Sequence, residues 1–440
     1  MNTTSFLCVL FSHPQDRQSG DYLHRVAWPG KALGRSVAVH AIQSSHPHHL
    51  EKLVEADVLV INMVADARLL PLIRKRREER KVTVFEISDD FRSFPSHLPA
   101  HAFYSSREVQ DTIATLASES DAIQFSSRFL REKYGHLNAM HTTFPNQLPA
   151  IPTLKPAPGR KAVLGWAGSV GHFEDARWLA GTLSRWTLAG KIAIRLMATD
   201  EIASLFRSSG LDVSVTTPGD MRAYLNFLGK IDIGLAIAHG DDFASGRSDG
   251  KFIEYASRGV VAVCSDGAPY SDSVRHGETG FLFRDEEELL EILTRLVRDR
   301  GLRNRIRRQA HQYLRTSRTH AAAAQERLDF YTRLLASGKH DRASARVTAS
   351  PGYRELIDDI EPAFTQAMLM HREGKAAEAI AIYTRLAEKA PAFHLLWERM
   401  GQACTLLGAT AQAESCRQRA RFLLEEDYAR CGLAMSSHAT

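Results

Sequence analysis

Cysteine is scarce in this sequence, and long hydrophobic runs are missing. The five cysteines are scattered, odd in number and without a C-x-x-C pair, which argues against a disulfide framework or a structural zinc site. No stretch approaches the roughly 20 apolar residues that cross a bilayer. The short apolar run at the N-terminus has no basic residues before it and predicts a first β-strand, not a signal peptide. We therefore expect a cytoplasmic protein with at most peripheral membrane contact.

A strong excess of charge of either sign is also missing. The formal net charge is only +5 in 440 residues, and basic residues alternate with acidic ones over most of the chain. We expect no nucleic-acid partner. Two basic clusters, Arg74–Arg77 and Arg303–Arg308, lie in amphipathic helical contexts and are predicted to form solvated helix faces. The alternative is attraction to anionic lipid or to a phosphorylated substrate.

The length predicts two or three domains. Between Ser5 and Phe144, short β-rich runs alternate with helical stretches, which is the pattern of a parallel, doubly wound sheet. The candidate strands are Phe6–Phe11, Val37–Ile42, Val58–Met63, Val82–Ile87 and Ala122–Phe125. Pro145–Arg160 then carries five prolines and little periodicity, so we interpret it as a linker.

A second alternating series follows this linker and predicts a second α/β domain. Its candidate strands are Ala162–Trp166, Ile192–Met197, Val213–Val215, Ile231–Ile237 and Val260–Cys264. Open α/β sheets bind ligands at the carboxyl ends of their strands. Two Rossmann-like sheets facing each other would therefore enclose a cleft.

Past a polar stretch, Ser337–Gly352, the pattern becomes purely helical with a period of 34 residues. The small residues Ala367, Gly374 and Ala379 recur 34 positions later as Gly401, Gly408 and Ala413. This resembles the tetratricopeptide repeat, although an unrelated helical hairpin is the alternative. Two repeats are fewer than the three or so that usually stand alone. We expect them to lean on the rest of the chain, on another copy or on a protein partner.

The segment from Gly246 to Ser265 joins a loop of small and charged residues to a helix. Such a loop presents backbone N–H groups and the positive end of the helix dipole to an anion. Arg247 and Lys251 add two cations at the same entrance, with Ser248 between them. Glu254 lies one turn after Lys251, where a carboxylate can accept hydrogen bonds from vicinal hydroxyls. Pyrophosphate and ribose are the ligands that fit this pattern.

Four pieces of this region occur in a family-like order. They are Asp232-x-Gly-Leu, Lys251-Phe-Ile-Glu-Tyr-Ala-x-x-Gly259, Gly277-Glu-Thr-Gly-Phe-Leu-Phe283 and Asp285-Glu-Glu-Glu-Leu. Together they resemble the nucleotide-sugar half of retaining glycosyltransferases of family 4. That resemblance covers about 164–335 strongly and implies the GT-B fold, two Rossmann-like domains facing across a cleft, here followed by a small all-α repeat domain.

The resemblance also implies roles for individual residues. Glu254 would bind the ribose of a nucleoside diphosphate sugar, and Arg247 and Lys251 its diphosphate. Each could instead be an ordinary surface residue, Glu254 on an exposed helix face. Family members usually have a second glutamate eight positions before Glu254, where this sequence has Gly246. The sugar half of the donor site is therefore left open.

The glycine-rich turn from Gly165 to Gly171 is expected to face the same cleft. It does not have the G-x-G-x-x-G spacing of dinucleotide-binding proteins, which argues against a dehydrogenase. By the resemblance, Gly168 and Ser169 are candidate contacts to the donor phosphates. His172 is either an assisting group or an ordinary packed or exposed histidine.

In the first half, Asp89 and Asp90 follow a predicted strand, where a cleft residue belongs. Either could orient or deprotonate an acceptor hydroxyl, or could serve as a helix N-cap. We find no clear nucleophile, no counterpart of the family's N-terminal histidine, and no D-x-D motif. The resemblance implies retention by same-face attack, with cations stabilising the departing phosphate and no metal or tightly bound cofactor required.

The predicted organisation has three parts. Residues 1–150 form an acceptor-side domain braced by helix 319–336, residues 160–318 bind the nucleotide sugar, and residues 353–430 form the repeats. The predicted activity is sugar transfer to a glycan, lipid-linked or protein acceptor. The alternative is a non-catalytic scaffold of the same fold that recruits partners through its repeats.

Overall fold

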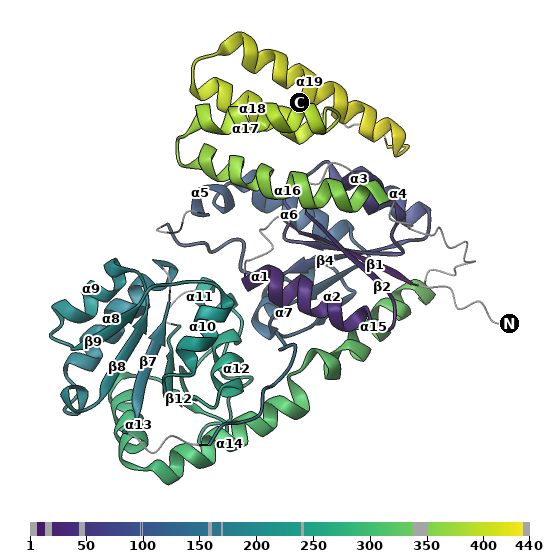
Figure 1. The fold of residues 1–440 in the computed structure, drawn as a ribbon. Coiled ribbons are helices and arrows are strands. Elements are labelled where there is room, and N and C mark those ends of the chain that lie inside the picture. The colour runs from purple at the N-terminus through teal and green to yellow at the C-terminus, as the bar shows by residue number, and fades with distance from the viewer. Residues whose placement is uncertain are drawn as a thin grey trace.

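A computed structural model describes residues 7–13, 20–43, 49–96, 98, 100–156, 161–168, 170–238, 242–337 and 351–433. Two α/β domains lie side by side, and a layer of long helices covers the outer side of the first (Figure 1). The domain pair confirms the predicted fold class. The carboxyl ends of both sheets face the space between the domains, so the loops that follow the strands meet there.

The first sheet is parallel, with the strand order β2-β1-β3-β4-β5-β6. Its strands are β1 (Cys8–His13), β2 (Ala38–Gln43), β3 (Val58–Asn62), β4 (Val82–Ile87), β5 (Ala122–Phe125) and β6 (His141–Thr143). Five of them were predicted. The sixth, β6, was missed because three half-exposed polar residues at a sheet edge show no alternation.

Helices cover both faces of this sheet. They are α1 (Gly20–Tyr22), the π-helix η1 (Leu23–Ala27), α2 (Trp28–Leu33), α3 (His49–Glu55), α4 (Leu69–Glu78), α5 (His101–Tyr104), α6 (Arg107–Glu119), α7 (Arg128–Tyr134) and the short 3₁₀ turn η2 (Gly135–Leu137). One face buries Val9, Phe11 and Val60 beneath α2, and the other buries Leu59, Ile61 and neighbours beneath α3, α4 and α6. The continuous helix from α1 to α2 starts at the cleft and runs away from it, because it follows β1.

The second sheet is also parallel, with the order β12-β11-β10-β7-β8-β9. Its strands are β7 (Val163–Ala167), β8 (Ala193–Met197), β9 (Val213–Thr216), β10 (Ile233–Ala236), β11 (Val261–Ser265) and β12 (Phe281–Phe283). The helices are η3 (Val170–His172), α8 (Phe173–Ser184), η4 (Ala189–Lys191), α9 (Asp200–Ser208), α10 (Met221–Leu228), α11 (Asp242–Gly246), α12 (Gly250–Ser257), α13 (Glu286–Arg298) and α14 (Arg300–Ser317). The strand order reverses between β7 and β10, and such a switch point is where open α/β sheets bind ligands.

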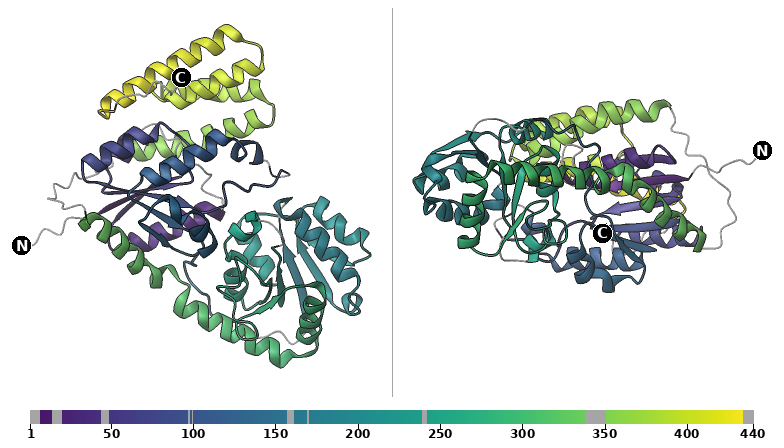
Figure 2. Two further views of the ribbon diagram at one scale, coloured as in Figure 1. Left: turned by 180° about the vertical axis from the view of Figure 1, so that it is seen from behind. Right: turned by 90° about the horizontal axis from the view of Figure 1, so that it is seen from below.

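Helix α15 (His320–Ser337) returns from the second domain to the first. It packs Phe330, Tyr331 and Leu334 into the core of the first domain, and the Tyr331 hydroxyl donates to Gln124 Oε1 at 2.8 Å. Its start lies beside Leu148, which bridges to Thr319. The linker at Leu148 and helix α15 both pass between the domains, and they tie the domains together on one side (Figure 2).

The C-terminal helices form two antiparallel hairpins, α16 (Pro351–Arg372) with α17 (Ala376–Lys389) and α18 (His394–Leu406) with α19 (Thr410–Arg430). Gly374 and Gly408, 34 positions apart, have positive φ values of 79° and 72° in the two turns. The hairpins lean on the first domain, because Leu424 and Tyr428 join its core and the Tyr428 hydroxyl donates to the Arg68 carbonyl at 2.7 Å. The tetratricopeptide assignment stays a prediction. Within the described residues, no helix is both long and apolar enough to cross a membrane.

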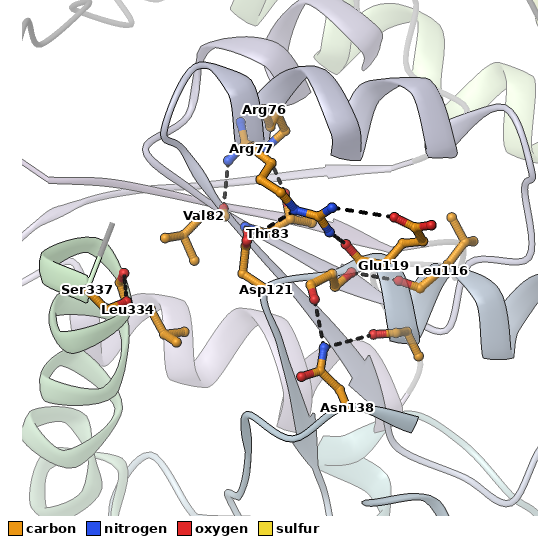
Figure 3. Close-up of polar contacts among 12 residues, drawn as sticks. Arg76, Arg77, Val82, Thr83, Leu116, Glu119, Asp121, Asn138, Leu334 and Ser337 are labelled. Carbon is orange, nitrogen blue, oxygen red and sulfur yellow. Dashed lines mark hydrogen bonds and ion pairs between the residues drawn. The ribbon is translucent and has the colours of Figure 1, made fainter. Parts of the chain in front are cut away.

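The basic cluster on α4 is not the solvated face that was predicted. Arg76 is fully buried and donates to the carbonyls of Leu53 at 2.6 Å and Ala56 at 2.8 Å. It also donates to the Val82 carbonyl at 2.7 Å (Figure 3). Burial lowers the pKa of its guanidinium to about 10. The interpretation was wrong for Arg76 because a helical wheel cannot show that its side chain reaches the carbonyls at the end of α3, where the helix dipole favours a cation. Neighbouring Arg77 pairs with Glu119 instead.

Candidate functional site

The turn after β7 is built from glycines that leave no room for a side chain. A Cβ on Gly165 would lie 2.5 Å from Ile231, and one on Gly168 would lie 2.4 Å from the Trp166 ring. Gly168 already donates its backbone N–H to the Met197 carbonyl at 3.1 Å, so this group is not free for a ligand. Ser169, the other predicted contact in this turn, lies outside the described residues. The turn therefore brings the backbone close to the cleft, next to the switch point.

Arg247 and Lys251 converge on this turn, although they come from a different part of the sequence. The Arg247 guanidinium donates to the Gly171 carbonyl at 2.8 Å and lies 2.9 Å from His172 Nδ1. The Lys251 ammonium donates to the Ala167 carbonyl at 2.8 Å. The predicted cations are thus placed together. His172, the residue just before α8, lies against Arg247.

Asp175 is a member of this cluster that the sequence reasoning missed. Its Oδ2 lies 2.9 Å from His172 Nδ1 and 3.5 Å from Arg247 Nη1, and the residue is 7% exposed. The i, i+3 spacing from His172 on a helical segment was the available signal. Asp175 compensates only one of two cations, so the cluster keeps a net positive charge that an anion could neutralise.

Burial perturbs the ionisable groups of the cluster. Removal from water, with a smaller effect from Arg247, lowers the pKa of Lys251 to about 8. Burial and the nearby Lys251 charge lower the pKa of His172 to about 3, so this imidazole is neutral at physiological pH. A bound phosphate would favour the charged form of Lys251 and raise its pKa.

The first turn of α12 opens beside these cations. Asp249 occupies the N-cap position but makes no capping hydrogen bond, because its carboxylate pairs with Arg318 at 2.6 Å and accepts from the Ser273 hydroxyl. The first-turn N–H groups of α12 therefore have no side-chain cap. Ser248, just before the helix, accepts a hydrogen bond at 2.9 Å from the Asn146 amide in the interdomain linker.

Glu254 lies on the buried side of α12 and is 9% exposed, so the alternative of an exposed helix residue was wrong. Its Oε1 accepts a hydrogen bond from His24 Nε2 of the first domain at 3.2 Å. The Tyr224 hydroxyl of α10 is also bonded to this carboxylate. Glu254 is therefore held from both domains at the bottom of the cleft.

Gly246, which stands where the family usually has a glutamate, lies in close contact with the first domain. A Cβ on Gly246 would lie 2.9 Å from Asp90 Cβ and 3.3 Å from the Asp90 nitrogen. Lys133 joins the same contact, donating to Asp90 at 2.7 Å and to Asp242 of α11 at 2.6 Å. The domains meet here so closely that no side chain fits at position 246.

Asp90 is consequently an interdomain contact. It is fully buried, it accepts hydrogen bonds from Lys133 and the Tyr134 hydroxyl, and these bonds lower its pKa against the effect of burial. These contacts bind both carboxylate oxygens of Asp90 to the protein. A role for Asp89 or Asp90 toward an acceptor stays a prediction.

Asp89 is partly exposed and faces Arg247 across the cleft. Removal from water and the neighbouring Asp21 carboxylate raise the pKa of Asp89 to about 7, while Arg247 works in the opposite direction. Burial also raises the pKa of Asp21 to about 6, although a hydrogen bond with Ser88 opposes this. Asp21 was missed because it reaches the site from the start of α1, far from Asp89 in sequence.

Behind Asp89, a row of polar side chains crosses the end of the first sheet. Register pairs Asn62 with Glu86 and Glu86 with Gln124. Arg25 of η1 covers this row, forming an ion pair with Glu86 and donating to Asn146 Oδ1 at 2.9 Å. Sequence reasoning missed Arg25 as well, because a buried arginine in a helical run has no pattern of its own.

A cavity of about 520 Å³ lies on the linker side of this cleft, lined by Gln147, Asp249, Arg318 and His320 among others. Neither Lys251 nor Glu254 lines it. We therefore define the candidate site by the charged cluster and not by this cavity.

Changing Gly246 to alanine is expected to push the domains apart, because the added Cβ would lie 2.9 Å from the Asp90 Cβ. Small-to-large changes at a tight contact usually cost about 1–3 kcal/mol. We expect a lower thermal midpoint and lower nucleotide affinity. Gly181→Ala in α8, where nothing lies within 4 Å, is the matched control and should stabilise the helix slightly. Equal behaviour of the two variants would contradict the close contact.

Comparison with known proteins now bears on this site. Residues 180–329 match a family model described as glycosyl transferase-like. That segment includes Arg247 and helix α12, which carries Lys251 and Glu254. No curated protein matches the chain.

Solved structures match over both α/β domains. HepE of Anabaena, in complex with UDP and glucose, is 13% identical with a TM-score of 0.58, covering 74% of this chain and 100% of that one. A glycosyltransferase from Rickettsia africae is 13% identical with a TM-score of 0.54, covering 75% and 99%. Sucrose-phosphate synthase of Thermosynechococcus elongatus is 12% identical with a TM-score of 0.53, covering 75% and 100%. The chain therefore has the GT-B fold, and its second domain carries a glycosyl transferase-like sequence.

Proposed function

We propose that this protein is a retaining glycosyltransferase of the family 4 type, which moves a hexosyl group from a nucleoside diphosphate sugar to a glycan, lipid-linked or protein acceptor. The observation that carries the proposal is the meeting of Arg247, Lys251 and the uncapped start of α12 at the switch point of the second sheet. This positive cluster lies across the cleft from Asp89. The cations that would stabilise the leaving phosphate therefore face the carboxylate that would orient the acceptor.

In this proposal the second domain holds the donor. The diphosphate lies between the guanidinium of Arg247, the ammonium of Lys251 and the first-turn N–H groups of α12, with Gly168 and Ser248 beside it. The ribose lies against Glu254. HepE was solved with UDP and glucose, which supports uridine diphosphate sugars as the first donors to test.

The chemistry follows from these positions. The bond between the sugar C1 and the phosphate oxygen breaks, and negative charge grows on the diphosphate. Arg247, Lys251 and the dipole of α12 stabilise this charge. The acceptor oxygen attacks C1 on the face that the phosphate leaves, and its proton passes to the departing phosphate, while Asp89 orients the acceptor hydroxyl. We expect no requirement for a metal.

A panel of nucleotide sugars tests this function directly. We expect turnover or slow hydrolysis of at least one uridine diphosphate sugar, and loss of nucleotide binding in Glu254→Ala. The exposed variant Glu291→Ala on α13 is the control. If no nucleoside diphosphate binds at millimolar concentration, the proposal fails.

The pH dependence of kcat/KM is expected to be a narrow bell. Asp89 must be ionised, so activity rises as pH increases through about 7. Lys251 must be charged, so activity falls as pH increases through about 8. Each limb should change by about tenfold per pH unit well away from the optimum. Asp89→Asn should remove the acid limb; a flat profile from pH 5.5 to 9.5 in the unmodified protein would contradict both assignments.

The alternative of a non-catalytic scaffold is favoured by Gly246, where a glutamate usually stands, and by the missing counterpart of the family's N-terminal histidine. In that case nucleotides would bind without turnover, and partners would be retained through the helical hairpins. Cutting the chain at Ser337 is a poor test, because it would uncover the first-domain core that Leu424 and Tyr428 cover. Substituting the exposed Leu406 and Leu407 tests partner retention without that damage.

A further inference from the structure

The contact between His24 and Glu254 joins two residues from different domains. Both residues are buried, with side chains that are 8% and 11% exposed, and Nε2 lies 3.2 Å from Oε1. The two residues are 230 positions apart in the sequence. This is a direct polar contact from the first domain to the carboxylate that we assign to the donor ribose.

The π-helix η1 holds His24 at this place. Single-turn π-helices occur mostly at functional sites, because they shift the side chains of one turn relative to the rest of the helix. Here η1 turns Arg25 toward Glu86 beneath the sheet, while His24 extends to the second domain. Trp28 fixes the imidazole with an edge contact at 4.5 Å and itself packs against the core of the second domain.

His24 also has a buried ring atom without a partner. Its Nδ1 makes no hydrogen bond with any described residue, although the imidazole is almost fully buried. Because Nε2 points at Glu254, Nδ1 points away from that carboxylate, and a ribose beside Glu254 would not reach it. The Nε2 bond to Glu254 is therefore the contact through which His24 acts on the donor end of the site.

We propose that His24 is a positioning residue for the donor: the first domain holds the Glu254 carboxylate, and with it completes the ribose-binding end of the site. Glu254 keeps lone pairs for the ribose hydroxyls, since a carboxylate accepts about four hydrogen bonds and His24 and Tyr224 use two. Ribose recognition then depends on the closed arrangement of the two domains. This inference rests on the proposed function.

The test compares uridine diphosphate with 2′-deoxyuridine diphosphate by calorimetry. We expect the unmodified protein to bind the ribose form about tenfold or more tightly, because the deoxy form leaves a buried carboxylate lone pair unfilled. In His24→Ala that preference should fall below about threefold, with KM for the donor raised and kcat little changed. His24→Gln, whose amide can still donate, should restore part of the preference.

The control is His136→Ala, which removes an exposed histidine outside the cleft. It should leave the preference unchanged. Undiminished preference in His24→Ala, or tighter binding of uridine diphosphate by that variant, would overturn the role of His24 while leaving the proposed function intact. A protein that binds neither nucleotide would overturn the proposed donor site itself.

Discussion

Replacing Lys251 with methionine is expected to lower kcat/KM by about 10²- to 10³-fold, the usual effect of removing one group that stabilises transition-state charge. The Lys251 ammonium lies 5.4 Å from the centre of the Trp166 ring, and methionine removes this charge while keeping the length of the apolar stem. The loss should appear in kcat as well as KM, because the negative charge on the diphosphate grows as the sugar leaves. Steady-state kinetics with a uridine diphosphate sugar measures it.

The control for this prediction is Lys191→Met, which removes an exposed lysine in η4. Its kinetics and its thermal midpoint should match those of the unmodified protein. Lys251→Met should also lose the alkaline limb of the pH profile. A tenfold or smaller effect on kcat/KM would mean that Lys251 supports the turn after β7 through its bond to Ala167 and does not meet the diphosphate.

Replacing Arg25 with alanine is expected to cost about 3–5 kcal/mol of folding free energy, the range for removing one partner of a buried ion pair. Glu86 is fully buried, and it would lose its cation while keeping the hydrogen bond from the Gln124 amide. The Phe144 carbonyl and Asn146 would lose their hydrogen bonds too. Chemical denaturation, followed separately by far-UV and tryptophan signals, measures the loss.

The double variant Arg25→Ala, Glu86→Gln separates charge from packing. It should recover part of the lost stability, because the uncompensated carboxylate is gone. Arg35→Ala, at an exposed position just after α2, is the matched control and should change stability by less than about 0.5 kcal/mol. Equal stability of Arg25→Ala and Arg35→Ala would refute the buried pair.

The residues of the candidate site that lie close together in the sequence could be predicted from the sequence alone. Arg247, Lys251 and Glu254 lie within eight positions, on one loop and one helix, so a single stretch of sequence carries their chemistry. Asp89 follows a strand that alternation and burial make easy to predict. Asp21 could not be found in this way, because it matters only through Asp89, which another element supplies. Asp175 had a local signal in its spacing from His172, but its contact with Arg247 joins distant segments.

The stretch from Arg247 to Phe283 by itself predicted the residues of the proposed donor half, because a loop, a helix start and their cations are local features that follow from sequence order. Only the tertiary structure decided the rest. The approach of Asp90 left no room for a side chain at Gly246. The pairing of His24 with Glu254 likewise arises from the packing of two domains, and contacts between distant segments depend on that packing and not on any pattern within one segment.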